Sequence, residues 1–294
     1  MPTSPKPQRR EHPSTYFVQD RQSEEELIRL KIQDSMITTA MGGPLAGLDN
    51  AADLRRVLDI GCGPGGWIIE AARIYPELFL TGIDISQRMI SYARKQAIAQ
   101  QVADRVEFHI MDALRMLEFP DDFFDGVNLR LGVSYLRTWD WPRVLNEMLR
   151  VTRPGGTVQV TDQEIIHERK GPTSNPALTQ LNAMFLCALF RSGHLFKQES
   201  TGLIAHLPGL LKQHGFKNVQ TKFSTIDYRA GTPEWEPYYN DTLHLFKTAR
   251  PFLQKWGCIS EDYDSLYQQA SVEMRRLNYH SAWKFLTTWG IKGS

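Results

Sequence analysis

Two kinds of segment alternate along the middle of this 294-residue chain. Short runs of apolar residues, typical of strands buried on both faces of a parallel sheet, alternate with segments in which apolar residues recur three or four positions apart, as in helices. The runs predict strands at 57–61, 78–84, 106–111, 124–129 and 157–162. The segments between them predict helices at 66–75, 86–101 and 140–151. Strands separated by helices of this length form right-handed parallel units, so we expect an α/β sheet with helices on both faces.

The regions on either side of this alternation are more helical. A helix is expected at 24–41, because Ser23 can cap it and three glutamates fill its first turn. Arg153-Pro154-Gly155-Gly156 is expected to form a turn before the fifth strand. Beyond that strand the pattern predicts helices at 175–191 and 200–214, a strand at 219–228, helical structure at about 240–280 and a last strand at 282–290.

The composition shifts divide the chain into five parts. Residues 1–14 carry four prolines and almost no apolar side chains, so they are expected to form a disordered tail. The other parts are an N-terminal helical lid at 15–50, a Rossmann-like core at 51–162, a helical cap and return helix at 163–218, and the last two strands at 219–294 with a helical insertion at 234–280.

Charge and hydropathy exclude two classes of partner. Lysine and arginine number 34 against 33 acidic residues, so the formal charge of +1 gives no surplus of cations for nucleic acid. The most apolar helical window, 177–190, is shorter than the ~20 apolar residues that span a bilayer. We therefore expect neither nucleic acid nor a membrane as a partner.

The cysteines and histidines suggest no metal and no disulfide framework. Cys62, Cys187 and Cys258 lie far apart in the sequence, and no Cys-x-x-Cys pair occurs. The eight histidines show no metal-binding spacing such as His-Glu-x-x-His. Together with the absence of a secretory signal in the tail, this predicts a cytoplasmic protein in a reducing compartment.

The most informative motif is VLDIGCGPGGW at 57–67, between a predicted strand and a predicted helix. Gly61 permits a sharp turn, Gly63 lets the backbone approach a ligand, and Gly65 or Gly66 lets the helix pack closely on the strand. The spacing also fits the G-x-G-x-x-G pattern of dinucleotide-binding proteins. By itself the motif therefore leaves a nicotinamide or flavin dinucleotide open.

Three further features favour an adenosyl sulfonium over a dinucleotide. Asp59 stands inside the motif, where a carboxylate could meet a cationic amino group but would disfavour a pyrophosphate. Asp112-Ala113 follows the third strand and can contact an adenine amine, whereas Asp84 ends the second strand and could bind the ribose hydroxyls of either cofactor. The strings FDGV at 124–127 and RPGG at 153–156 then follow in order.

In this ordered set of motifs the sequence resembles the class I S-adenosylmethionine-dependent methyltransferases. The resemblance covers residues 54–162 and implies a Rossmann-like seven-stranded sheet, six strands parallel and the last antiparallel. It implies S-adenosyl-L-methionine as cofactor and S-adenosyl-L-homocysteine as product. The expected cofactor-binding residues are Asp59, Gly61, Cys62, Gly63, Gly65, Asp84, Ile85, Met89, Asp112, Ala113, Asn128, Leu129 and Arg130.

The candidates for catalysis lie near the ends of the fourth and fifth strands, where ligands bind in open α/β sheets. Glu164 and His167 are candidate general bases, although both could equally belong to a solvated loop. Tyr16 is a third catalytic candidate. The residues expected to contact the substrate are Tyr16, Phe17, Ser134, Tyr135 and Phe185.

Aromatic residues in the two helical insertions predict a cap over an apolar pocket, and hence a small, largely apolar metabolite as substrate. The string STYFVQDRQSEEELIRL resembles bacterial secondary-metabolite methyltransferases of the teleocidin type. O-methylation and C-methylation remain open, as do an NAD-dependent oxidoreductase on the same loop and a non-catalytic cofactor-binding protein. The N-terminal or cap segments could also form a homodimer interface.

Overall fold

The computed structural model describes residues 16–18, 23–45, 54–169 and 176–293. One mixed sheet runs through the molecule, in the order β3-β2-β1-β4-β5-β8-β6, with β7 also paired to β8. The strands are β1 Arg56–Ile60, β2 Phe79–Asp84, β3 Val106–Ile110, β4 Phe124–Arg130, β5 Thr152–Gln163, β6 Glu168–Arg169, β7 Phe216–Arg229 and β8 His280–Lys292.

The strand directions confirm the predicted fold class. The pairings among β1 to β5 are all parallel. β8 runs antiparallel to β5, and β7 runs antiparallel to β8, so β7 points the same way as the first five strands. Six long strands therefore share one direction and the last opposes them. The two-residue strand β6, which pairs with β8, is an addition that the sequence pattern did not predict.

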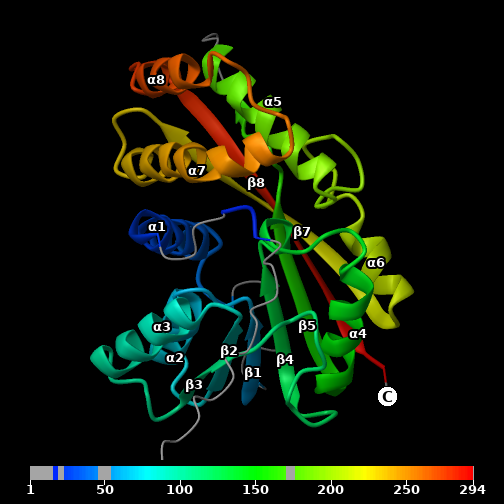
Figure 1. The fold of residues 1–294 in the computed structure, drawn as a ribbon. Coiled ribbons are helices and arrows are strands. Elements are labelled where there is room, and N and C mark those ends of the chain that lie inside the picture. Colours follow the sequence, from blue (N-terminus) through cyan, green and yellow to red (C-terminus); the bar gives the residue numbers. More distant parts are fainter. Residues whose placement is uncertain (1–15, 19–22, 46–53, 170–175, 294) are drawn as a thin grey trace, which may run out of the picture.

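The helices form two layers and a cap (Figure 1). α1, α2 and α3 lie on one side of the sheet, and α4 and α6 lie on the other. α5, α7 and α8 gather beyond the end of the sheet, around the long strand β8. Their bounds are α1 Glu24–Ala40, α2 Gly66–Ile74, α3 Gln87–Ala99, α4 Trp141–Val151, α5 Pro176–Arg191, α6 Leu207–Gln213, α7 Trp235–Lys255 and α8 Tyr263–Met274.

Local capping explains where the helices nearest the glycine motif begin. The hydroxyl of Ser23 accepts a hydrogen bond from the backbone N–H of Glu26 at 3.2 Å, and the hydroxyl of Ser86 accepts one from the N–H of Met89 at 3.4 Å. Each bond satisfies an N–H that has no partner within its helix. These caps place α1 and α3 beside the carboxyl ends of the strands.

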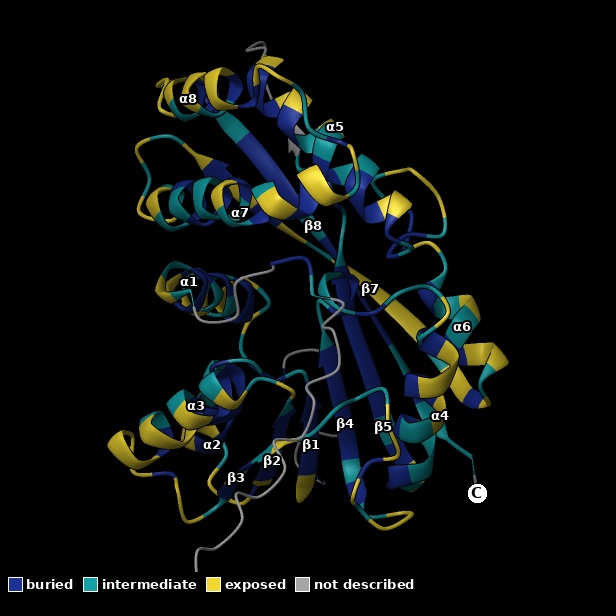
Figure 2. Ribbon diagram, viewed as in Figure 1, coloured by how far each residue is buried: buried dark blue, intermediate teal, exposed yellow. Residues whose placement is uncertain are grey.

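Burial follows the layers (Figure 2). β4 and β5 are covered on both faces, and most of their side chains are buried. α4 presents Val144, Leu145 and Met148 to the sheet, each 1% exposed or less. Burial of such side chains contributes about 1.5–3 kcal/mol each. The larger of the two core clusters therefore lies around β4, β5 and the cap, and the smaller one lies beneath the glycine motif.

Several predicted boundaries were wrong. The helix expected at 200–214 is confined to α6, with turns before it, because Pro208 falls in its first turn. The turn expected at 153–156 is an irregularity within β5, where the register against β4 shifts between Phe124 and Gly126. The insertion expected at 240–280 consists of two helices, α7 and α8. The tail prediction for residues 1–14 falls outside the described residues.

The structure also contradicts the expectation of no disulfide. Cys187 on α5 and Cys258, in the link between α7 and α8, form a disulfide with their Cα atoms 6.0 Å apart. They are 71 positions apart in sequence, and Arg191 contacts the carbonyls of Trp256 and Gly257 beside them. Tertiary packing of the cap, which no local pattern reveals, brings the pair together. The cysteine spacing therefore gives no support for a reducing compartment, and cytoplasmic localisation stays a prediction.

Candidate active site

A cavity of about 220 Å³ lies above the carboxyl ends of β1, β2 and β3. The glycine loop at 61–64 forms its floor, residues 83–86 and 111–114 form one side, and α1 covers it. Because the strands are parallel and adjacent, the segments that follow them meet at one edge of the sheet. We call this space the large cavity.

Hydrogen bonds to neighbouring strands hold the glycine loop in place. The backbone N–H groups of Gly61 and Cys62 both donate to the carbonyl of Ile83 at 2.9 Å. Gly63 has a φ of +52°, in the left-handed region that favours glycine, and a Cβ there would meet nothing within 4 Å. The backbone at Gly63 thus borders open space, as a loop that approaches a ligand should. At Gly65 the space for a Cβ is filled by Ala93 and Phe108, so this glycine serves helix–strand packing.

Three carboxylates, one after or within each of the first three strands, line the large cavity. Asp84 accepts hydrogen bonds from the N–H of Gly63 at 3.0 Å and of Ser86 at 2.7 Å, so it joins the loop to the start of α3. Asp112 accepts a bond from the N–H of Leu114 at 2.9 Å. Among the described lining residues, five are acidic and one, Arg130, is cationic. The large cavity therefore favours a cationic, donor-rich ligand over an anion.

Asp59 is the most buried of the three. Its side chain is 4% exposed and accepts a hydrogen bond from the carboxamide nitrogen of Asn128 at 2.8 Å. Burial raises its pKa to about 7, although the nearby Arg130 guanidinium and the Asn128 bond oppose the rise. A cation placed beside Asp59 would stabilise the carboxylate form.

Arg130 connects the end of β4 to α1. Its guanidinium pairs with Asp34, donates to the hydroxyl of Thr38 at 3.0 Å, and lies 5.8 Å from the centre of the Trp67 ring. α1 is therefore held over the large cavity by charge as well as by packing. The sequence pattern singled out Arg130 but none of the α1 residues that line the cavity, because the buried side of α1 mixes polar and apolar residues and gives no local sign of what it covers.

The large cavity brings together most of the predicted cofactor-binding residues. Those that line it are Asp59, Gly61, Cys62, Gly63, Asp84, Ile85, Met89, Asp112, Ala113 and Arg130. Gly65, Asn128 and Leu129 do not line it: Leu129 is fully buried in the core, and Asn128 reaches the site only through Asp59. Of the predicted substrate residues, Tyr16, Ser134 and Tyr135 line it.

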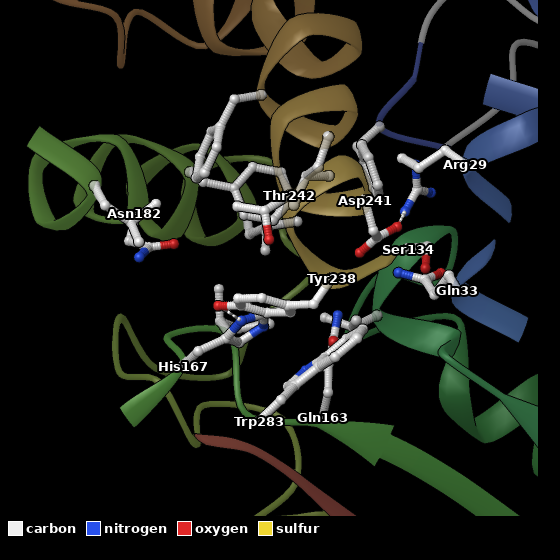
Figure 3. A pocket seen from close by; sticks show the side chains of 18 residues that line it. Arg29, Gln33, Ser134, Gln163, His167, Asn182, Tyr238, Asp241, Thr242 and Trp283 are labelled. Carbon is white, nitrogen blue, oxygen red and sulfur yellow. Dashed lines mark hydrogen bonds and ion pairs between the residues drawn. The ribbon is translucent and has the colours of Figure 1, made fainter. Parts of the chain in front are cut away.

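A second, smaller cavity of about 30 Å³ adjoins the first, and Gln33 and Ser134 line both. Its walls come from α1, α5 and α7, the end of β5 and the start of β8 (Figure 3). Phe17, Phe185 and His167, which the sequence analysis named as candidate site residues, line it, whereas Glu164 lines neither cavity. We call this space the small cavity.

His167 and Tyr16, two of the three catalytic candidates from the sequence, are poorly suited to remove a proton. Burial lowers the pKa of His167 to about 3, so its imidazole is neutral at physiological pH and a weak base. Its Nδ1 lies 2.9 Å from the hydroxyl of Tyr238. Burial, with the neighbouring Glu26 carboxylate, raises the pKa of Tyr16 well above its usual value, so the phenol stays protonated.

The small cavity contains a carboxylate that the sequence pattern did not reveal. Asp241 on α7 is 2% exposed and accepts a hydrogen bond from the Arg29 guanidinium at 3.1 Å. Arg29 also pairs with Glu26 at 2.8 Å, which makes a buried charge network between α1 and α7. Burial raises the pKa of Asp241 to about 6, against the lowering effect of Arg29. Nothing in the α7 sequence marks Asp241, because its importance depends on α1 packing beside it.

The described residues show neither a cluster of metal ligands nor a membrane-spanning helix. No group of three or more His, Cys, Asp or Glu side chains in the described ranges is arranged to hold a metal ion. Among the described helices, none combines the length and the apolar character that crossing a bilayer requires.

Comparison with known proteins supports the assignment of the glycine motif. Residues 57–156 match the family model described as "Methyltransferase domain". The chain is 32% identical over 154 residues to the ubiquinone/menaquinone biosynthesis C-methyltransferase UbiE of Geobacter sulfurreducens, covering 52% of this chain and 56% of that protein. It is 35% identical over 101 residues to the demethylmenaquinone methyltransferase of Symbiobacterium thermophilum, covering 34% of this chain and 39% of the relative. The chain thus spans about half or less of these relatives.

Solved structures share the fold over most of the chain. Phosphoethanolamine N-methyltransferase 2 of Haemonchus contortus, solved with phosphomonomethylethanolamine and S-adenosylhomocysteine, aligns with a TM-score of 0.51 and 20% identity, over 95% of this chain and 60% of that one. The YcgJ protein of Bacillus subtilis aligns with a TM-score of 0.52 and 18% identity, over 87% and 99%. Residues 57–156 therefore match a methyltransferase domain, within a chain that shares the Rossmann-like fold of these solved structures.

Proposed function

We propose that this protein transfers a methyl group from S-adenosylmethionine to a small molecule. The observation that carries the proposal is that Asp59, Asp84 and Asp112, at the ends of three adjacent parallel strands, line one cavity with the glycine loop. An ionised carboxylate accepts hydrogen bonds and donates none. Together the three carboxylates therefore suit a ligand that donates hydrogen bonds from a cationic amine, a vicinal diol and an exocyclic amine. A dinucleotide pyrophosphate would instead meet this acidic lining with no surplus of cations.

The residues present fit the cofactor at each part of the cavity. Asp84 would hold the ribose hydroxyls, Asp112 with Ala113 would contact the adenine, and Asp59 would hold the amino group. The cofactor, once bound, supplies an electrophilic methyl group on a sulfonium. The chain must then align the acceptor with that methyl group, exclude water and, for an O–H or N–H acceptor, remove a proton.

The small cavity is proposed as the acceptor site, because it adjoins the large cavity through Gln33 and Ser134. Its apolar and aromatic walls support the predicted class of a small, largely apolar metabolite. Asp241 has the charge, the location and the pKa to accept a proton from an acceptor near neutral pH. An O-methyl transfer would use it, whereas a carbon–carbon double bond would need no base for the transfer itself. Secondary metabolism and a homodimer stay predictions.

Calorimetry with two ligands tests the proposal. S-adenosylhomocysteine is expected to bind the purified chain with saturable heat, and NAD⁺ is expected not to bind, because its pyrophosphate faces the acidic lining. Tight NAD⁺ binding without S-adenosylhomocysteine binding would overturn the assignment. A non-catalytic protein would bind S-adenosylhomocysteine but would methylate nothing in a host-cell extract followed by untargeted mass spectrometry.

Ligand binding is also expected to release a proton from Asp59 at pH 6.5. In the free protein the pKa of Asp59 is about 7, so the carboxyl is mostly protonated at that pH. The ligand's amino group, with an ordinary pKa near 8, is already cationic and would lower the pKa of Asp59. Binding should therefore tighten as pH rises through 7, with release of roughly half a proton or more at pH 6.5.

Titrations at pH 6.5 in two buffers of different ionisation enthalpy measure that proton. Asp59→Asn keeps an oxygen to accept from Asn128 and should abolish the release. Asp104→Asn, at an exposed carboxylate paired with Arg105, is the matched control and should change nothing. Equal proton release from wild type and Asp59→Asn would show that the amino group does not lie beside Asp59.

A further inference from the structure

Two buried polar atoms that border the small cavity have no hydrogen-bond partner among the described residues. They are the indole Nε1 of Trp283 on β8 and the carboxamide Oε1 of Gln163 on β5. Trp283 is 1% exposed, so bulk water does not satisfy its N–H. Leaving a buried donor or acceptor unpaired is unfavourable, because the group has lost its hydrogen bonds to water and gained none in return. One donor and one acceptor are therefore available to a bound molecule.

The sheet register places these two side chains together. Gln163 is paired with Phe285 across β5 and β8, and Trp283 lies two residues before Phe285. Side chains two positions apart on a strand share a face, so Gln163 and Trp283 are diagonal neighbours on one face of the sheet. Figure 3 shows both side chains at the base of the cavity, next to His167 and beneath Tyr238.

The walls of the small cavity are flat and aromatic. The rings of His167 and Trp283 have centroids 4.6 Å apart, and those of His167 and Tyr238 are 5.5 Å apart. On another side, Phe17 and Phe185 meet edge to face at 5.4 Å. Such surfaces favour a planar, apolar ligand frame. A volume of about 30 Å³ suits a polar substituent of such a ligand, since one water needs roughly 10–15 Å³.

The charges around the small cavity disfavour an anionic ligand. Arg29 is the cation among its described lining residues, and it is already paired with Glu26 and Asp241. The imidazole of His167 is neutral, because burial lowers its pKa to about 3. A phosphate or carboxylate would thus meet no unpaired positive charge here. A neutral hydroxyl can satisfy both orphan atoms, because it accepts one hydrogen bond and donates another.

We propose that the small cavity binds the hydroxyl end of a neutral, planar methyl acceptor of the phenol type. The N–H of Trp283 donates a hydrogen bond to the hydroxyl oxygen, and the Oε1 of Gln163 accepts a hydrogen bond from that hydroxyl or from an adjacent one. The remainder of the ring system, which carries the atom to be methylated, extends toward Gln33 and Ser134, where the small cavity meets the large one. This inference rests on the proposed function, since it names the class of molecule to be methylated.

The test uses the full chain saturated with S-adenosylhomocysteine and three probes: phenol, toluene and phenyl phosphate. The indole N–H resonance of Trp283 is identified by its loss in Trp283→Phe. Phenol is expected to shift this resonance saturably, and toluene and phenyl phosphate to leave it in place. No saturable shift with phenol, an equal shift with toluene, or tighter binding of phenyl phosphate would each overturn the proposal.

Variants then assign the two hydrogen bonds. Trp283→Phe and Gln163→Met are each expected to weaken phenol binding about threefold to tenfold in ligand-observed NMR titrations, as for loss of one neutral hydrogen bond. Gln163→Met keeps the side-chain length and serves if Trp283→Phe fails to fold. Trp141→Phe is the matched control, because Nε1 of Trp141 is also buried and unpartnered within the described residues, but the Trp141 ring packs against Gly132 and lines neither cavity.

The outcomes separate this inference from the proposed function. The acceptor assignment alone would be overturned if S-adenosylhomocysteine still binds and phenol binds with equal affinity to Gln163→Met, Trp283→Phe and Trp141→Phe. Loss of S-adenosylhomocysteine binding by the wild-type chain would instead overturn the proposed function.

Discussion

Asp84→Ala is expected to weaken the binding of S-adenosylhomocysteine by roughly 10- to 150-fold. The variant removes a charge-assisted hydrogen bond to the ribose, and such a bond contributes about 1.5–3 kcal/mol to the binding free energy. It also removes the acceptor for the N–H groups of Gly63 and Ser86, so the glycine loop and the start of α3 lose their common anchor. Isothermal titration calorimetry measures the change in the dissociation constant.

Two comparisons make the Asp84 result specific. Asp84→Asn retains one acceptor oxygen and should lose less affinity than Asp84→Ala. Asp104→Ala removes an exposed carboxylate that contacts Arg105 and should leave the affinity unchanged. An Asp84→Ala protein that folds and binds S-adenosylhomocysteine as tightly as wild type would rule out a ribose role for this carboxylate.

Asp241→Asn is expected to lower kcat by about 10²- to 10⁴-fold for a hydroxyl acceptor, with a smaller change in KM. This is the usual contribution of a general base. Asn can still accept the hydrogen bond from Arg29, and Glu26 still balances the Arg29 charge, so the contact between α1 and α7 should persist. The rate is measured with the acceptor that mass spectrometry identifies.

The pH profile distinguishes a base from a structural residue. Only ionised Asp241 can accept a proton, so wild-type kcat/KM should fall as pH drops through about 6, the pKa of this carboxyl. Asp241→Asn should lack that inflection. Glu164→Gln is the matched control, because Glu164 lines neither cavity, and it should keep the wild-type rate and profile. A wild-type rate in Asp241→Asn would point to an acceptor whose methylation needs no base.

The residues of the proposed cofactor site could be recognised in the sequence, because each of them lies in or next to a short, clearly patterned stretch of the chain. The glycine loop occupies one continuous stretch, and Asp84 and Asp112 directly follow strands that apolar runs marked clearly. Parallel strand order then brings these ends to one edge. Leu129 is a predicted cofactor residue that does not line the large cavity: it is fully buried in β4, and the pattern along a strand covered on both faces does not show which side chains reach a ligand.

The sequence by itself determined the sheet, the glycine loop and the acidic strand ends, because apolar periodicity and strand-end residues act over a few neighbouring positions. Only the tertiary structure determined which residues form the proposed acceptor site. Arg29, Gln163, Asp241 and Trp283 come from α1, β5, α7 and β8, and they meet where the cap closes on the sheet. The same packing joins Cys187 to Cys258, lowers the pKa of His167 and raises that of Asp241. The burial of a side chain and the identity of its bonding partners depend on contacts between segments that are distant in the sequence. Such contacts leave no pattern within any single segment.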